Sequence, residues 1–125
     1  LERRKEIIAK YDVMCDEMGV SHLYHYTENS KSSGHLYLTR IPGVSDEIRR
    51  EIIIKLEKYG VNTNVHYKPL SMMTAYKELG WDIKDFPNAY DYYENVITLP
   101  LHTNLTDEDV DYVISIFKEV VSEYI

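Results

Sequence analysis

The hydrophobic positions near the start of this chain follow a helical period. Apolar side chains recur at three- and four-residue spacing between residues 1 and 18, which predicts an amphipathic helix that ends at Gly19. The same spacing recurs in residues 46–59, where Ser45 is a favourable N-cap residue and acidic side chains follow in the first turn. The first half of the chain therefore predicts two amphipathic helices.

The strongest helical pattern lies at the end of the chain, in residues 107–124. Thr106 precedes it and Asp109 follows three residues later, which resembles a capping box with aspartate in place of the commoner glutamate. Weaker patterns predict short helices over residues 72–79 and 88–95, the second of them rich in tyrosine.

Strand-forming segments lie between these helices. Residues 23–26, 35–41, 61–67 and 96–99 are rich in β-branched, aromatic and other apolar side chains, and turn-forming residues flank them. The polar loop 27–34 is suited to joining the first two strands as a hairpin. Strands separated by helices, with a hairpin among them, predict an α+β fold in which a small, mainly antiparallel sheet is covered by helices.

Length and charge narrow the class of protein. The 125 residues are enough for one domain, residues 1–125, with a hydrophobic core of its own. A net charge of −7 argues against a nucleic-acid partner. No apolar run reaches the ~20 residues that cross a bilayer, so we expect no membrane partner either. The only cysteine, Cys15, rules out an internal disulfide and favours a cytoplasmic location.

Tyrosine is unusually common, with 12 tyrosines against two phenylalanines and one tryptophan. Tyrosine side chains line interfaces and half-wet pockets, because the ring is apolar and the hydroxyl is polar. A tyrosine-rich core explains the same composition equally well, so composition alone leaves both interpretations open.

The segment from Gly60 to Leu70 carries the most unusual polar residues. If residues 61–67 form a strand, alternate positions place one set of side chains on a packed face and the other set on a polar face. The packed set is Val61, Thr63, Val65 and Tyr67, and the polar set is Asn62, Asn64 and His66. The polar face, with Tyr67 adjacent, could bind a polar ligand through amide and imidazole groups. A solvent-exposed or internally hydrogen-bonded sheet face is the alternative.

Other chemistry-bearing residues give weaker signals. His22 and His25 are expected on opposite faces of a strand-like segment, and no cluster of cysteines or carboxylates accompanies them, so we expect no metal site. Cys15 falls on the apolar stripe of its helix and is expected to be inert. The carboxylate pairs Asp107/Asp109 and Asp82/Asp85 are better explained by capping and solvation than by catalysis. No nucleophile elbow, zinc-protease pair, Walker loop or dinucleotide fingerprint is present.

Several segments, taken together and in order, match the pattern of a known family. They are Gly60–Leu70 (Gly-Val-Asn-Thr-Asn-Val-His-Tyr-Lys-Pro-Leu), Ala75-Tyr76, Asp85–Ala89, Val96–Leu101 and Leu105–Ile114, with weaker matches at His35–Ile41 and in the Arg-Arg-Lys helix at the start. The chain resembles the C-terminal domain of the DegT/DnrJ/EryC1/StrS aminotransferases over nearly its whole length.

The resemblance implies the small domain of a fold-type I enzyme that depends on pyridoxal phosphate (PLP). Such enzymes are homodimers that transfer an amino group, commonly from glutamate, to a keto sugar linked to a nucleotide, in polysaccharide, glycan or deoxyaminosugar biosynthesis. The matching positions imply that His66 and Tyr67 approach the substrate, with Tyr76 as a weaker candidate. Ser71 departs from the family, which often has histidine or another polar residue just after Pro-Leu.

The resemblance also implies that essential groups lie outside this chain. In the family, the lysine that forms a Schiff base with PLP belongs to the N-terminal large domain, and neither Lys31 nor Lys68 has its sequence context. The helix that starts at Leu1 has no N-cap residue, so we expect a fragment without its large domain. The fragment should have no catalytic, cofactor-binding or metal-binding residues of its own and should be inactive. A stand-alone, non-catalytic α+β module for binding or assembly is the alternative, and upstream coding sequence would decide between the two.

Overall fold

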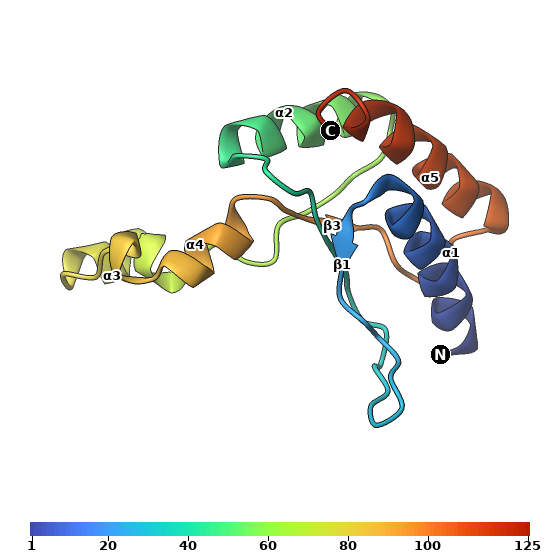
Figure 1. Cartoon of the computed structure of the whole chain (residues 1–125), viewed down its shortest axis with the longest axis horizontal. Helices are drawn as coiled ribbons and strands as arrows, with labels where there is room; N and C mark the ends of the chain where they lie inside the picture. The colour runs from blue at the N-terminus through green and yellow to red at the C-terminus, as the bar shows by residue number, and fades with distance from the viewer.

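The computed structural model describes all residues from 1 to 125. Its five α-helices have the bounds predicted from the sequence to within a few residues, and three β-strands and two 3₁₀ turns complete the fold (Figure 1). In chain order the elements are α1 (Glu2–Met18), β1 (Ser21–His22), β2 (Tyr37–Arg40), α2 (Asp46–Lys58), η1 (Leu70–Met72), α3 (Thr74–Glu78), η2 (Ile83–Asp85), α4 (Pro87–Tyr93), β3 (Val96–Leu99) and α5 (Asp107–Val121).

The three strands form one antiparallel sheet in the order β1-β2-β3. In the register of β2 and β3, Tyr37 pairs with Leu99 and Thr39 pairs with Ile97. Exposure alternates along β2, where Tyr37 and Thr39 are buried and the residues between and after them are half-buried. This small antiparallel sheet with helices confirms the α+β fold predicted from the sequence.

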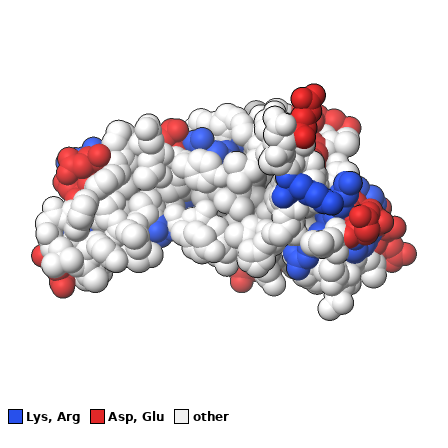
Figure 2. All heavy atoms as spheres, turned by 90° about the horizontal axis from the view of Figure 1, so that it is seen from below, with Lys and Arg blue, Asp and Glu red and all other residues white.

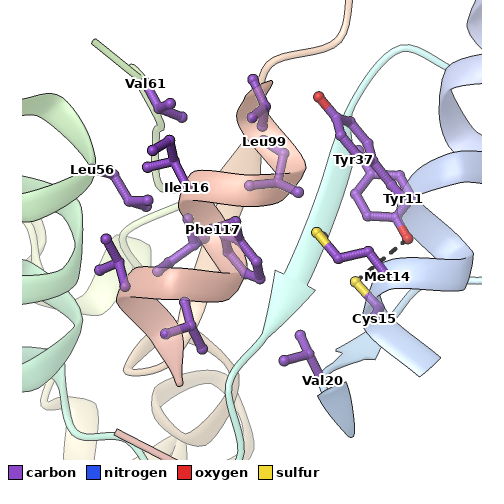
Figure 3. Close-up of a cluster of buried hydrophobic side chains, with 14 of the residues drawn as sticks. Tyr11, Met14, Cys15, Val20, Tyr37, Leu56, Val61, Leu99, Ile116 and Phe117 are labelled. Carbon is purple, nitrogen blue, oxygen red and sulfur yellow. Dashed lines mark hydrogen bonds between the residues drawn. The ribbon is translucent and has the colours of Figure 1, made fainter. Parts of the chain in front are cut away.

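Helices α1, α5 and α2 lie together against the sheet (Figure 1), and α5 contacts both of the others. Side chains from these helices and from β2 and β3 form one hydrophobic core, part of which is drawn in Figure 3. Its largest completely buried side chains are those of Tyr11, Tyr37, Phe117, Ile7, Ile8, Met14, Ile41, Ile52, Leu56 and Ile97. No helix is long and apolar enough to cross a lipid bilayer.

The predicted capping interactions are present. The Ser45 hydroxyl accepts a hydrogen bond from the amide of Ile48 at the start of α2. At the start of α5, the amide of Asp109 donates to the Thr106 hydroxyl at 3.1 Å, and the Thr106 amide donates to the Asp109 carboxylate at 2.9 Å. This reciprocal pair satisfies amides that have no partner within the helix.

Two predicted strands were wrong in position or type. The first strand lies at Ser21–His22 rather than at 23–26, and within the predicted segment only Tyr26 forms a bridge, with Lys31. Residues 61–67 do not form a strand, and Asn64 alone makes a bridge, with Thr98. The Asn64 side chain accepts the Val65 amide at 2.8 Å, and this local bond uses a donor that a ladder would otherwise need.

Helices α3 and α4 project from the body of the molecule as an arm (Figure 1), which is defined here as residues 70–95. Two arginines join the arm to the body. Arg40 of β2 donates to Asn95 Oδ1 at 2.9 Å and to the Asp91 carbonyl at 2.8 Å. Arg49 of α2 is 3% exposed, donates to the Tyr93 carbonyl and lies over the Tyr93 ring. The base of the arm is therefore fixed to both the sheet and a helix.

Candidate functional site

The segment that carries His66 is held against the sheet at Thr98. The amides of Asn64 and Thr98 each donate to the other residue's carbonyl, at 3.2 and 2.8 Å. On β3, Ile97 and Leu99 belong to the hydrophobic core, whereas Thr98, the residue between them, is outside that cluster. Because successive side chains of a strand point to opposite faces, Thr98 lies on the face opposite the core. The predicted candidate segment thus lies on the sheet face that the core does not use.

His66 and Tyr67 lie side by side at this face. The Nδ1 atom of His66 lies 2.8 Å from the Thr98 hydroxyl oxygen. The rings of His66 and Tyr67 meet edge to face, with centroids 4.6 Å apart and planes at 86°. Tyr67 is 71% exposed, which corrects the prediction that it belongs to the packed face of a strand. The peptide bond between these two residues is cis.

Tyr76 lies in a separate but adjoining part of the surface, on the arm. It lines an apolar pocket of about 330 Å³ that begins next to the candidate segment. The pocket is formed by Pro69, Leu70, Ser71, Tyr76, Trp81, Phe86 and Ala89. Ser71, at the position where the family often has a larger polar residue, is 8% exposed. The structure therefore brings His66 and Tyr67 together and connects them to Tyr76 through residues 69–71.

The residues that sequence reasoning missed here are Thr98, Trp81 and Phe86. Thr98 is a single polar residue in an otherwise apolar strand, which is a usable signal for a face that does not join the core. Trp81 and Phe86 gave no periodic signal, because the residues around them form short turns. Their rings lie 5.6 Å apart between centroids, so the loop brings them together.

Large exposed apolar side chains of the arm lie at residues 70–86 rather than at its base. Tyr93, at the base, is 7% exposed and packs under Arg49, because the arm is anchored at that point. Among the large hydrophobic residues at positions 1–18, only Leu1 and Val13 are exposed. The exposed apolar residues of the arm are Leu70, Met73, Tyr76, Leu79, Trp81 and Phe86.

One face of the molecule carries few charges around its middle. In Figure 2, most of the central part of the visible face is uncoloured, and charged atoms gather toward the two ends. At one end, ion pairs join α1 to α5, including Lys10 with Asp111 at 3.1 Å and Lys118 with Glu17 at 2.8 Å. Three acidic residues of α5 therefore have structural partners: Asp107 pairs with Arg3, Asp111 pairs with Lys10, and Asp109 caps the helix.

The other candidates from the sequence occupy structural positions. Cys15 is completely buried and accepts a hydrogen bond from the Tyr37 hydroxyl at 3.7 Å (Figure 3), and burial raises the pKa of its thiol to about 11. Asp109 caps α5, and Asp82 accepts the Lys84 amide at the start of η2. No three His, Cys, Asp or Glu side chains meet in an arrangement suited to a metal ion.

His22 and His25 are not on opposite faces of a strand, contrary to the prediction. Both rings stack on Tyr37, with centroids 6.1 and 5.6 Å from it. His22 also lies between two carboxylates, with Nδ1 3.2 Å from Asp12 and Nε2 3.1 Å from Asp16. These contacts join β1 to α1.

The carboxylates beside His22 make its contribution to stability depend on pH. Burial alone would lower the pKa of His22, but the hydrogen bonds to Asp16 and to the Leu23 carbonyl, with the charge of Asp12, raise it above the usual 6.5. The contribution of His22 to stability is therefore complete below pH 6.5 and is lost as the pH rises through the higher folded-state pKa.

An NMR titration of the histidine ring signals should show His22 titrating above pH 6.5, and Asp16→Asn should move this titration toward lower pH. Asp111→Asn, which removes a carboxylate that pairs with Lys10 instead, should leave it unchanged. Titration of His22 at or below 6.5 in the unmodified chain would contradict the assignment.

The lysines of this chain are all half-buried or exposed. A lysine that attacks a cofactor aldehyde must lose its proton, and this is favoured where the ammonium is desolvated or lies beside another cation. Lys10, Lys55 and Lys118 pair with carboxylates, and the hydrogen bond that Lys55 donates to Glu123 raises the pKa of Lys55. No lysine of this chain therefore lies in the desolvated surroundings that favour a neutral amine.

A sequence model of the DegT/DnrJ/EryC1/StrS aminotransferase family matches residues 1–118 of this chain. The chain belongs to this family. Among curated relatives, it is 30% identical over 123 residues to the spore coat polysaccharide biosynthesis protein SpsC of Bacillus subtilis, covering 96% of this chain and 32% of SpsC. It is 30% identical over 110 residues to the UDP-4-amino-4,6-dideoxy-N-acetyl-beta-L-altrosamine transaminase of Helicobacter pylori, covering 88% of this chain and 29% of that enzyme.

Solved structures of this aminotransferase family show the same arrangement. A Streptococcus pneumoniae protein assigned as a sugar aminotransferase, solved in its PLP form, is 50% identical and superposes with a TM-score of 0.95. The match covers 99% of this chain and 32% of that protein, which has also been solved in apo and PMP forms. The chain thus spans about a third of the length of the relatives it matches.

Proposed function

We propose that this chain is the small domain of a PLP-dependent aminotransferase. The whole enzyme transfers an amino group, which in this family commonly comes from glutamate, to a nucleotide-linked keto sugar. The observation that carries the proposal is the family match over residues 1–118, together with 50% identity to a protein solved in PLP form. The names of relatives supply the substrate class. One is the UDP-sugar transaminase of Helicobacter pylori and another is the dTDP-4-dehydro-2,3,6-trideoxy-D-glucose 4-aminotransferase of Saccharopolyspora spinosa, 29% identical over 126 residues.

The proposal divides the reaction between this chain and a cofactor-binding large domain. Bound PLP would supply the electron sink for moving the amino group. Residues of this chain would bind and orient the sugar nucleotide, with His66 and Tyr67 as hydrogen-bonding groups and Tyr76 at the edge of the arm pocket. Two observations support these roles: Tyr67 is exposed, and His66 is half-buried on the sheet face opposite the core.

The arm supports the proposed contact with a large domain. Its apolar side chains are exposed, and they surround a pocket of about 330 Å³. A contiguous apolar surface of this kind commonly marks an interface, because leaving it in water is unfavourable. In the relatives, about two-thirds of the length lies outside the matched region. We therefore propose that the large domain covers the arm, in a cytoplasmic homodimer that acts in glycan, polysaccharide or deoxyaminosugar biosynthesis.

The proposal predicts that the 125-residue chain alone is inactive and does not retain PLP. Mixing the chain with PLP and then removing free cofactor by gel filtration should leave no visible absorbance from lysine-bound cofactor, because no lysine is desolvated beside a pocket. The Streptococcus pneumoniae protein, treated in the same way, is the positive control. A stable visible band that survives filtration of the 125-residue chain would overturn this part of the proposal.

A stand-alone binding or assembly module remains the second candidate, because the chain has a hydrophobic core of its own. The two candidates differ in the coding sequence that they require. Several hundred codons upstream of Leu1, with a lysine in the family's context, would support the aminotransferase. A start codon at this point would support the module.

A further inference from the structure

The motif residue His66 has one hydrogen-bond partner in the protein, and that partner belongs to another element. Its Nδ1 atom lies 2.8 Å from the Thr98 hydroxyl oxygen on β3. The Nε2 atom of His66 makes no hydrogen bond within the chain and is not among the buried polar atoms that lack a partner. Nε2 is therefore the ring nitrogen that is open to a ligand.

Thr98 also fixes the backbone next to this histidine. Asn64 and Thr98 exchange two backbone hydrogen bonds, and this is the only β-bridge between residues 61–67 and the sheet. Thr98 itself is 5% exposed and lies in a strand whose four residues are all buried. A side chain held in this way offers its hydroxyl at a fixed position, since a β-branched residue has restricted rotation about χ1.

The hydrogen bond between His66 and Thr98 orients the imidazole ring in the same way whichever atom donates. If the Thr98 hydroxyl donates to Nδ1, the neutral ring carries its proton on Nε2 and presents a donor. If Nδ1–H donates to the hydroxyl, Nε2 presents an acceptor. In both cases the ring is held in one orientation, and the nitrogen that is open to a ligand is Nε2.

We propose that Thr98 is the positioning residue that presents Nε2 of His66 to the polar substrate. This inference rests on the proposed function for the role of His66, and it adds the residue through which the sheet controls that role. Thr98 lies outside the Gly60–Leu70 segment that defines the candidate site in the sequence.

The first test uses the 125-residue chain labelled with ¹⁵N at its histidines. Long-range ¹H–¹⁵N spectra distinguish the two ring nitrogens, and His66→Ala assigns the signals of this residue. We expect the Nδ1 shift of neutral His66 to reflect its hydrogen bond to the Thr98 hydroxyl. Thr98→Val keeps the β-branched shape but removes the hydroxyl, and it should change the Nδ1 shift. Thr98→Ser should restore the original Nδ1 shift.

A matched control shows whether the change in the His66 shifts is specific to Thr98 or follows the loss of any buried hydroxyl. Thr39 lies on the neighbouring strand, is completely buried and donates to the Ile97 carbonyl at 2.8 Å. Thr39→Val should leave the His66 shifts unchanged. An unchanged Nδ1 shift in folded Thr98→Val, or an equal change of the Nδ1 shift in Thr39→Val, would overturn the inference. If Thr98→Val does not fold, the His66 shifts of Thr98→Cys can be compared with those of Thr98→Ser, because a thiol is the weaker hydrogen-bonding group.

The second test measures the consequence for substrate. It uses a hybrid in which this chain replaces the matching region of the Streptococcus pneumoniae protein, which is 50% identical. Losing one hydrogen bond to a positioned group should raise KM for the keto sugar by roughly two- to tenfold in Thr98→Val, and Thr98→Ser should recover it. If Thr98→Val changes the Nδ1 shift of His66 but leaves KM unchanged, the positioning role would be overturned. Activity that does not depend on His66 at all would overturn the proposed function, so the two failures are distinct.

Discussion

Replacing Phe117 with alanine is expected to lower the free energy of unfolding by about 3–5 kcal/mol, as large-to-small substitutions of buried aromatic residues do. Phe117 is completely buried at the centre of the core that α5 shares with the sheet (Figure 3). Domains of this size are stable by only about 5–15 kcal/mol. The substitution should therefore leave a chain that is marginally folded at room temperature.

The only other phenylalanine, Phe86, provides the matched control. It lies on the arm, is 36% exposed and lines the arm pocket, so Phe86→Ala should cost less than about 1.5 kcal/mol. Urea unfolding should be followed by circular dichroism, since fluorescence would report on Trp81 of the arm rather than on the core. Equal losses for the two variants, or a loss below about 1 kcal/mol for Phe117→Ala, would contradict the assigned core.

His66→Ala in the hybrid enzyme is expected to lower kcat/KM for the keto sugar by roughly tenfold to a hundredfold. The estimate follows from the loss of one hydrogen bond to a charged group, about 1.5–3 kcal/mol. UDP- and dTDP-linked keto sugars are the substrates to test, because relatives that act on both classes match this chain. His35→Ala, at an exposed histidine that precedes β2, should leave kcat/KM unchanged. A hybrid that is active and equally insensitive to both substitutions would contradict the role of His66.

The helices could be predicted because their signals are local. The apolar stripe of α5 repeats at three- and four-residue spacing, and the reciprocal bonds of Thr106 and Asp109 join residues three positions apart, so both signals are visible in the sequence. The segment 61–67 was misassigned because its alternation of apolar and polar residues also suits an irregular chain that touches the sheet at one point. The contact with Thr98 that decides its conformation lies 34 residues from Asn64, beyond any local pattern.

The candidate site was predictable only in part, for a related reason. His66 and Tyr67 were found through their motif, and the structure places them together on one face. Thr98 was missed because a threonine in a strand is ordinary, and only the fold reveals that its hydroxyl meets an imidazole. The arm was missed as an exposed apolar surface because short turns at residues 70–72 and 83–85 bring Leu70, Trp81 and Phe86 together without helical spacing.

Activity of the unmodified hybrid tests the central claim most directly. This chain replaces the matching third of the Streptococcus pneumoniae protein, with which it superposes at a TM-score of 0.95. If the chain is the substrate-side domain of a sugar aminotransferase, the purified hybrid should retain PLP and aminate a nucleotide-linked keto sugar with glutamate as donor. A hybrid that folds and retains PLP but aminates none of the UDP- and dTDP-linked keto sugars would contradict the claim.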